Sequence, residues 1–409
     1  MASKSRRSPT SPPGAIRRST TAVETAENRR QLVEMARVTL GHVDAGNTPS
    51  QEPDVLRVPA EHYLDPVRWA REVAMFKRTP LMLALAGELP APASYKAMTV
   101  MDTPVLLTRG SGGEVRAFLN SCSHRGAVVM EDGHGTARRF ACPYHAWTYD
   151  TKGDLVGVTD REFFGDIDTS CLGLTPLPVA ERAGLIFVVL TPGATMDIDE
   201  HLCGYDQVLD FFGFGGWHLI SRREIPGPNW KVAYDGYLDF YHLPFLHRNS
   251  FGTEISNKAI YHAWGPHQRV TSPDPGLVES RDLPDDEWDL DTVCGGVWTI
   301  FPHVSLAGGN GGGLISQLFP GPTPETSVTV QNYFVAAEPS DERRAEALGV
   351  ADFLERVVRD EDYYTGLRLQ RALATGAKPD VLFGRNEGGG QRFHTLLDSF
   401  VDEVPVSLR

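Results

Sequence analysis

The spacing of apolar, Pro and Gly positions divides the chain into helical and strand-like regions. The stretch ENRRQLVEMARVTL contains neither Pro nor Gly, so we expect a helix over residues 24–40. DPVRWAREVAMFKR predicts a second helix, with Asp65 as N-cap and Pro66 at the first helical position. From about Met98 to Leu190, short β-prone runs are separated by Gly, Asp and Asn, which is typical of small antiparallel sheets.

The C-terminal half mixes both patterns. NWKVAYDGYLDFYH predicts a helix over residues 229–242, and Pro244 should stop it. Residues 294–337 return to strand-like patterns, and GGNGGG within them predicts a loose hairpin turn, because it lacks the Lys-Ser/Thr of a P-loop. A last long helix is expected from about Asp352 to Ala374, with Gly376 as its C-cap. The predicted fold class is therefore α+β with a mostly antiparallel β component.

Composition adds limits on size, compartment and partners. With 409 residues, 41% hydrophobic and 22% charged, the chain can form two or three ordinary globular domains. Its longest apolar runs are too short to span a membrane, and its basic N-terminus lacks the apolar core of a secretory signal. We therefore expect a cytoplasmic protein without a membrane partner. The net charge of −14 argues against nucleic acid as a partner. Residues 1–22, basic and rich in Ser, Thr and Pro, predict a disordered tail rather than a transit peptide.

Two short stretches place a cysteine close to a histidine. SCSHRGAVVM contains Cys122 and His124, and CPYHAWTY contains Cys142 and His145. A reducing compartment disfavours a disulfide. A Cys2His2 zinc site and a Rieske [2Fe–2S] cluster would both accept two thiolates and two imidazoles. A zinc finger pairs its cysteines on one element, whereas each loop here supplies one Cys and one His, which suits a cluster whose two irons have different ligands.

A second group of candidate ligands lies downstream. His242 and His247 are too far apart to share one face of a regular helix, but Pro244 between them could turn the chain back. Asp239 and His242, three residues apart, do share a face. Two histidines and a carboxylate form the facial triad of non-haem Fe(II) oxygenases. The third ligand could come from the acidic run at residues 360–362, where Asp362 lies on the apolar stripe of the predicted helix and Glu361 lies near it.

These motifs resemble Rieske non-haem iron oxygenases, in particular their terminal oxygenase (α) subunits. The resemblance covers about Asp65 to Gly376 and is strongest in FLNSCSHRGA, CPYHAWTYD and NWKVAYDGYLDFYHLPFLH. It implies that Cys122 and Cys142 bind one cluster iron, and that His124 and His145 bind the other. It also implies His242, His247 and Asp362 as ligands of a mononuclear Fe(II), with Glu361 as runner-up. Asp239 would be an electron bridge rather than a ligand.

Respiratory Rieske proteins carry a disulfide at the positions of Ala127 and Tyr144, so its absence points to a lower, oxygenase-like potential. The remaining cysteines have no ligand spacing and are interpreted as ordinary small apolar residues; they are Cys171, Cys203 and Cys294. Arg125, Arg138 and Arg139 lie in or between the cluster loops, and they could attract an acidic ferredoxin or be solvated charges.

The resemblance also implies architecture and activity. After the 1–22 tail and an N-terminal helical segment at 23–60, residues 61–175 would form a small antiparallel β Rieske domain. Residues 176–409 would form a helix-grip (START-like) catalytic domain with an antiparallel sheet. The chain would hydroxylate an aromatic or other apolar ring substrate with O2. Electrons from NAD(P)H would arrive through a separate reductase, a ferredoxin or both, because the chain has no nicotinamide or flavin fingerprint.

The resemblance further implies a homotrimer, with or without a β subunit, in which Asp239 joins His145 of one chain to His242 of the next. Alternatives are oxidative N- or O-demethylation, quaternary-amine oxygenation, or a Rieske electron carrier without catalysis. A carrier would have no use for the second group of ligands.

Overall fold

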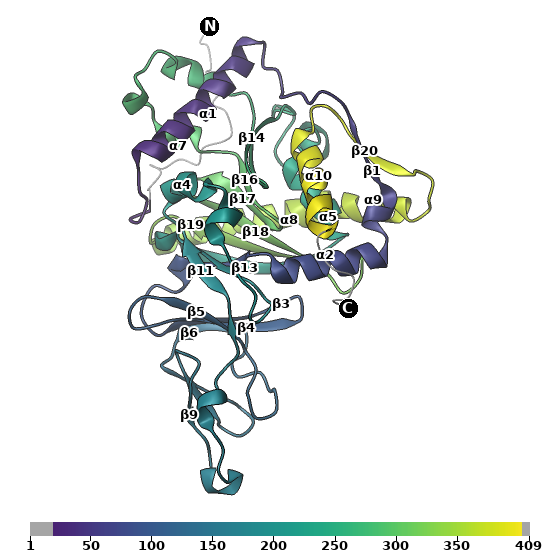
Figure 1. Cartoon of the computed structure of the whole chain (residues 1–409). Helices are drawn as coiled ribbons and strands as arrows, with labels where there is room; N and C mark the ends of the chain where they lie inside the picture. Colours follow the sequence, from purple (N-terminus) through teal and green to yellow (C-terminus); the bar gives the residue numbers. More distant parts are fainter. Residues whose placement is uncertain (1–18, 403–409) are drawn as a thin grey trace.

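A seven-stranded antiparallel sheet forms the centre of the upper body of the molecule (Figure 1). The computed structural model describes residues 19–402. In sheet order the strands are β13 (His218–Gly227), β19 (Ser327–Val335), β18 (Gly312–Pro320), β17 (Val304–Gly309), β16 (Val297–Ile300), β15 (His267–Thr271) and β14 (Ile260–Trp264). The strand of this sheet that comes first in the chain, β13, pairs with the one that comes last, β19. From β19 onward, each strand pairs with the strand that precedes it in the chain, down to β14 at the other edge.

The narrower protrusion below this body is built from small antiparallel sheets, as the Gly- and Asp-punctuated pattern predicted (Figure 1). The five-stranded sheet is β10 (Pro176–Leu177), β5 (Val115–Leu119), β4 (Thr103–Arg109), β3 (Ser94–Val100) and β6 (Gly133–Thr136). The two three-stranded sheets are β11 (Val179–Arg182), β12 (Leu185–Val188), β2 (Leu81–Leu85), and β7 (Arg139–Ala141), β8 (Thr148–Asp150), β9 (Leu155–Gly157). The predicted α+β class is confirmed, with small antiparallel sheets in one part of the chain and helices around an antiparallel sheet in the other.

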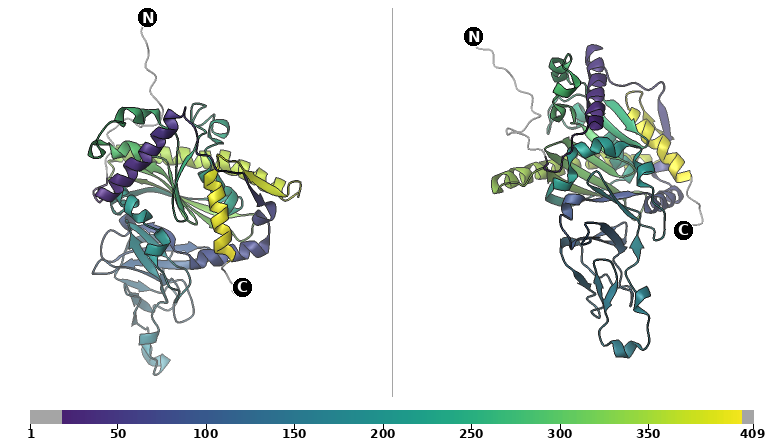
Figure 2. Two further views of the ribbon diagram at one scale, coloured as in Figure 1. Left: turned by 45° about the horizontal axis from the view of Figure 1, so that its top comes forward. Right: turned by 60° about the vertical axis from the view of Figure 1, so that its left-hand side comes forward.

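Helices pack around the large sheet and join the two ends of the chain (Figure 2). Helix α5 contacts β18 and β19, α8 contacts β13 and β19, and α10 contacts both α5 and α2. The longer helices are α1 (Ala26–Asp44), α2 (Pro66–Arg78), α5 (Trp230–Leu238), α8 (Asp341–Val357), α9 (Tyr364–Leu373) and α10 (Gly388–Asp402). The short ones are α3 (Ile198–Leu202), α4 (Tyr205–Leu209), α6 (Leu243–Leu246) and α7 (Leu290–Val293). A two-stranded sheet of β1 (Leu56–Pro59) and β20 (Asp380–Phe383) ties the two ends of the chain together.

Several helix boundaries follow the predicted capping signals. The Asp65 carboxylate accepts hydrogen bonds from the backbone N–H groups of Val67 and Arg68, so it caps α2 as predicted. The long C-terminal helix starts at Asp341 instead of Asp352, because the Ser340 side chain caps it there. Gly376 adopts a φ of +68° and its N–H donates to the Leu373 carbonyl, which terminates α9. The glycine-rich segment is the predicted hairpin turn between β17 and β18.

The predicted helix at 229–242 is four residues too long. It ends at Leu238, because Asp239 has extended backbone angles and its carboxylate accepts the N–H of Tyr241. Pro244 does not stop this helix. It lies in the first turn of α6, where a missing N–H costs no hydrogen bond.

The predicted disordered tail falls mostly on residues 1–18, which lie outside the described part of the chain. Residues 19–22 are described, and Ser19 is buried. The hydroxyls of Ser19 and Thr21 both donate to the Gly213 carbonyl, at 2.6 Å and 2.7 Å. The packed chain therefore begins before the predicted boundary. Within residues 19–402 no helix combines the length and the apolar character needed to cross a membrane.

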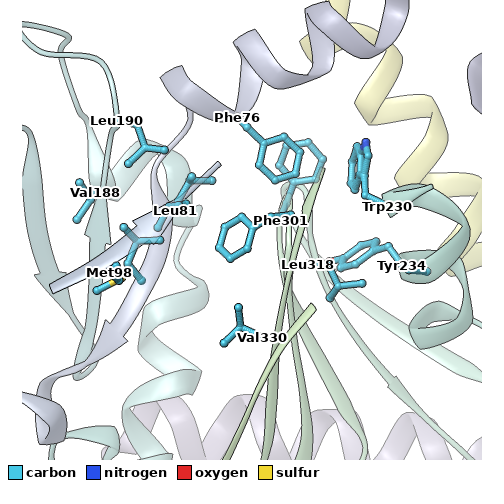
Figure 3. Packing of buried hydrophobic residues seen from close by; sticks show 14 of the residues in the cluster. Phe76, Leu81, Met98, Val188, Leu190, Trp230, Tyr234, Phe301, Leu318 and Val330 are labelled. Atoms are coloured by element: carbon cyan, nitrogen blue, oxygen red, sulfur yellow. The ribbon is translucent and has the colours of Figure 1, made fainter. Parts of the chain in front are cut away.

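One hydrophobic core joins the protrusion to the large sheet. Figure 3 shows Leu81, Met98 and Val188, from the strands of the protrusion, in the same cluster as Trp230 and Leu318 of the upper body. Phe76 of α2 packs edge-on against Trp230, with ring centroids 5.0 Å apart. Because both parts of the chain contribute to this cluster, it holds them together. Each large apolar side chain that is fully buried there stabilises the fold by roughly 1.5–3 kcal/mol.

Candidate metal centres

The two Cys/His loops have the same backbone geometry. In the first loop the N–H of Gly126 donates to the Cys122 carbonyl, and the Cys122 N–H donates to the carbonyl five residues ahead. In the second, the N–H of Ala146 donates to the Cys142 carbonyl, and the Cys142 N–H donates to the Trp147 carbonyl. Both turn residues have positive φ, +77° and +55°. The matched loops therefore present one buried thiol each.

The two histidines of these loops face each other. The Nδ1 atoms of His124 and His145 are 3.2 Å apart, and the two rings lie at 63° with centroids 4.7 Å apart. Trp147 is buried and stacks on His124, at 5.0 Å between centroids and an interplanar angle of 13°. Burial lowers the pKa of His124, and the neighbouring His145 and Arg125 lower it further. Two imidazoles that aim equivalent nitrogens at one point can share a metal ion.

The thiol side of the centre is dry and hydrogen-bonded. Cys122 and Cys142 are each 3% exposed. The Tyr149 hydroxyl donates to the Cys122 sulfur at 3.2 Å and accepts from the Ser123 N–H at 2.9 Å. Burial, and then this contact with sulfur, raise the pKa of Tyr149 to about 12, so it remains a donor.

The other three cysteines form no disulfide. The prediction that all three are ordinary apolar residues is wrong for Cys171 and Cys203, which are exposed, whereas Cys294 is buried.

A second centre lies at the end of α5 and the turn α6. His242 precedes α6 and His247 follows it, so one short helix places both rings with centroids 5.1 Å apart. Asp362 approaches from a distant segment: its Oδ1 is 3.6 Å from His242 Nε2 and 3.3 Å from His247 Nε2. His242, His247 and Asp362 each offer one donor atom, and these three atoms lie within 4.8 Å of one another. Within residues 19–402, no other group of three or more His, Cys, Asp or Glu side chains meets this spacing. The donor set suits a facial-triad iron.

Each histidine of the second centre is held through its other nitrogen. The His242 Nδ1 lies 3.1 Å from Asp239 Oδ2, and the His247 Nδ1 lies 2.6 Å from Glu361 Oε2. Asp239 and His242 therefore meet as predicted, although they do not share a helix. Burial alone would lower the pKa of His247, but Asp362 and Glu361 outweigh it, and the pKa is raised. Glu361, the predicted runner-up ligand, contacts the nitrogen that faces away from Asp362.

Asp362 lies on an irregular turn rather than on the regular helix that the apolar stripe predicted. Residues Val358–Tyr363 form a π-helical turn, η9, between α8 and α9. Such turns often occur at functional sites. From this turn the consecutive carboxylates of Glu361 and Asp362 both reach the imidazole of His247.

The first residues of α5 are anchored in the core. Asn229 is 1% exposed; it caps the helix through the Lys231 N–H and donates to the carbonyls of Tyr63 and Pro324. Glu72 of α2 is fully buried and accepts from Trp230 Nε1 at 2.8 Å and from Lys231 Nζ at 2.5 Å. Helix α2 was predicted to belong to the cluster domain, yet it packs against α5 and α10. These contacts fix the helix whose end carries the second centre.

A cavity of about 690 Å³ lies against the same segment. Pro244 and Phe245, which lie between the two histidines, and Arg248, which follows them, line this cavity. Residues 253–258, which include Glu254 and Lys258, also line it. No ion pair of Arg248 or Lys258 occurs within residues 19–402, so two cations face this space with one carboxylate. The sequence analysis did not identify these residues, because nothing in their spacing marks a cavity.

The two centres thus offer one donor set of two thiols and two imidazoles, and a second of two imidazoles and a carboxylate. Residues 79–163 match the family described as "Rieske [2Fe-2S] domain", and residues 214–403 match "Ring hydroxylating alpha subunit (catalytic domain)". The chain belongs to the Rieske non-haem iron oxygenases, as an α subunit. Both donor sets described above fit the cofactors that these families imply, a [2Fe–2S] cluster and a mononuclear iron.

Individual relatives differ in coverage. The carnitine monooxygenase oxygenase subunit of Escherichia coli (strain K12) is 27% identical over 83% of this chain and 92% of its own length. The 2-aminobenzenesulfonate 2,3-dioxygenase subunit alpha of an Alcaligenes species is 29% identical over 51% of this chain. The matched region spans about half of that relative, 55% of its length. A solved structure of a quaternary ammonium Rieske monooxygenase has a TM-score of 0.73 at 23% identity and covers 85% of this chain and 96% of its own. A further structure of that kind, with a TM-score of 0.70 at 22% identity over the same shares, is described as giving insight into inter-subunit electron transfer. These structural likenesses establish the fold.

Proposed function

We propose that the protein is the terminal oxygenase of a multicomponent Rieske oxygenase, which hydroxylates a small ring substrate with O2. The observation that carries this proposal is the second centre: Asp362, from a segment over a hundred residues away, meets His242 and His247 with donor atoms within 4.8 Å. A Rieske electron carrier has no use for this group. When bound, the cluster would pass electrons to the mononuclear iron, which would bind and activate O2.

In this proposal each predicted site residue has a separate role. Cys122 and Cys142 hold one iron of the cluster, and His124 and His145 hold the other through the Nδ1 atoms that face each other. The Nε2 atoms of His242 and His247, together with the Asp362 carboxylate, hold the mononuclear iron. Three protein ligands leave positions open for O2.

Electron transfer is proposed to run between chains. The cluster loops lie in the protrusion with β9, while α5 lies in the upper body (Figure 1), and within residues 19–402 no hydrogen bond or ring contact joins the two centres. A homotrimer in which the His145 ring of one chain meets Asp239 of the next would close this gap. Asp239 is suited to such a bridge, because a carboxylate can accept from both imidazoles and it already contacts His242. A β subunit is not required for this path.

The electrons are proposed to come from NAD(P)H through a separate reductase, ferredoxin or both. None of the five cysteines, all within residues 19–402, forms a disulfide, which is consistent with the reducing cytoplasm. The exposed Arg125, Arg138 and Arg139 lie in or between the two Cys/His loops in the sequence and form no ion pair within residues 19–402. They therefore leave positive charge available to an acidic ferredoxin.

The substrate is proposed to enter through the cavity beside α6. Arg248 and Lys258 favour a ring compound that carries an acid group, such as a benzoate or benzenesulfonate. Oxygenation of a quaternary ammonium compound is the second candidate, because Phe245 and Glu254 on the same walls suit a cation. A carnitine monooxygenase oxygenase subunit is among the relatives that are matched over most of their length, 92% of it.

The proposal is tested by oxygen uptake. Reduced holoenzyme is supplied with a surrogate ferredoxin and reductase and screened against aromatic acids, their neutral amides and quaternary ammonium acids. We expect substrate-dependent O2 uptake with a hydroxylated product for the aromatic acids. Uptake and formaldehyde or aldehyde release with the quaternary ammonium acids alone would favour the second candidate. Cluster reduction without oxygenation of any compound, by an enzyme with its mononuclear iron in place, would contradict an oxygenase.

A further inference from the structure

Glu361 sits next to Asp362 in the chain but approaches His247 from the opposite side of the ring. Its Oε2 atom lies 2.6 Å from His247 Nδ1, whereas the Asp362 Oδ1 atom lies 3.3 Å from Nε2. The Ser250 hydroxyl donates to the same Glu361 oxygen at 2.8 Å. The His247 side chain is only 4% exposed, so few other acceptors can reach its Nδ1.

We propose that Glu361 is a positioning residue, which holds His247 in the tautomer and orientation that present Nε2 to the mononuclear iron. This inference rests on the iron site proposed above and adds a residue to it. A carboxylate can only accept, so the imidazole proton must sit on Nδ1 and the lone pair on Nε2. The same contact raises the basicity of Nε2, which strengthens a metal bond.

The contacts of Glu361 also show why it is not a fourth ligand. Its carboxylate is held by Nδ1 and by Ser250, on the side of His247 that faces away from Asp362 and His242. The two carboxylates reach the two nitrogens of one ring from consecutive positions of the π-helical turn Val358–Tyr363. The irregular turn thus supplies a ligand and its support from consecutive positions.

The two histidines of the site are supported in different ways. Asp239 supports His242 and is also proposed to carry electrons from the next subunit, so its removal affects two processes. Within residues 19–402 the Glu361 carboxylate bonds to His247 and Ser250, so its removal should affect the iron and leave the cluster unchanged. This separation makes the role of Glu361 measurable without turnover.

The experiment compares Glu361→Ala and Glu361→Gln in the purified holoenzyme, with Asp360→Asn as the matched control. Asp360 lies on the same turn, is exposed and pairs with Arg359. The readouts are the affinity for the mononuclear iron under chelator competition and the electron paramagnetic resonance spectrum of its nitric oxide adduct. The iron-to-sulfide ratio and the Rieske spectrum report on folding and on the cluster in each sample.

We expect Glu361→Ala to weaken mononuclear iron binding by about 10–100-fold and to change the nitric oxide spectrum. Glu361→Gln should lose less, because its amide oxygen can still accept from Nδ1. Asp360→Asn should behave like the wild type, and the Rieske spectrum should stay constant throughout. Unchanged affinity and an unchanged spectrum in Glu361→Ala would overturn the inference. Loss of iron as complete as in Asp362→Ala would also overturn it, since Glu361 would then be a ligand. Retention of the iron in both His247→Ala and Asp362→Ala would contradict the proposed iron site itself.

Discussion

Removing the charge of Glu72 should destabilise the protein by several kcal/mol, although the residue lies outside both metal centres. Glu72 is fully buried, and its carboxylate accepts from Lys231, from Trp230 and, at 2.9 Å, from Arg68. In Glu72→Gln the Lys231 ammonium, which is 1% exposed, loses its counterion. Breaking a buried ion pair by removing one partner costs about 3–5 kcal/mol.

The properties of Lys231 set an upper bound on this loss. Burial already lowers the pKa of Lys231 from its ordinary value of 10.5, and Glu72 opposes that shift. Without Glu72 the lysine can give up its proton, which at pH 7 costs about 1.36 kcal/mol for each of roughly 3.5 pH units, or about 5 kcal/mol. The unfolded chain then binds more protons than the folded one. The stability of Glu72→Gln should therefore rise with pH between 7 and 10, relative to the wild type.

The assay is chemical and thermal unfolding of Glu72→Gln, followed by circular dichroism. Glu61→Gln, the same change at an exposed position in the preceding turn, is the control and should have little effect. Replacing both members of the pair, as in Glu72→Gln with Lys231→Met, should recover most of the loss, because no unpaired charge remains. A destabilisation of less than about 1 kcal/mol in the single variant, with no added pH dependence, would refute this account of how α5 is anchored.

The remaining predictions concern pH, electron transfer and docking. Burial lowers the pKa of His267 to about 4. It lowers the pKa of three further histidines to about 3; these are His201, His262 and His303. As the pH falls below 6.5, the histidines of the unfolded chain take up protons before those of the folded chain. Each of the four should therefore lower the free energy of unfolding by about 1 kcal/mol between pH 7 and 5.5, measured by urea unfolding. A free energy of unfolding that does not change over this pH range would contradict their burial as neutral rings. Asp239→Asn should keep both metals and lose most turnover, since an amide cannot accept from two rings in the same way; full activity would show another electron path. Arg138→Glu with Arg139→Glu should slow reduction by an acidic ferredoxin at low ionic strength and matter less at high salt; an unchanged rate would exclude docking there.

The parts of the site that could be predicted from the sequence are those encoded by local spacing. Cys122, His124, Cys142 and His145 lie in two short loops whose turns repeat the same hydrogen bonds, so their approach follows from the motifs. His242 and His247 lie at the two ends of a four-residue helix. Asp362 was selected from three acidic neighbours by resemblance and by the apolar stripe.

Other features depend on tertiary contacts that no local pattern reveals. A π-helical turn has no composition of its own, so the support of His247 by Glu361 could not be read from the sequence. The end of α5 at Leu238 did have a signal, since an Asp that bonds to a backbone N–H two residues later commonly ends a helix. Glu72 resembles an ordinary charged residue of an amphipathic helix, and its burial becomes evident only when α2 packs against α5.

The central claim, that one chain carries a Rieske cluster and a separate mononuclear iron, is tested most directly by metal and sulfide analysis of anaerobically purified protein. The account predicts about three iron and about two labile sulfide per chain, with a Rieske-type signal after dithionite reduction. In Asp362→Ala it predicts the loss of one iron, with the sulfide content and that signal retained. Stoichiometric zinc without labile sulfide would contradict the account, and so would a wild-type iron content that Asp362→Ala leaves unchanged.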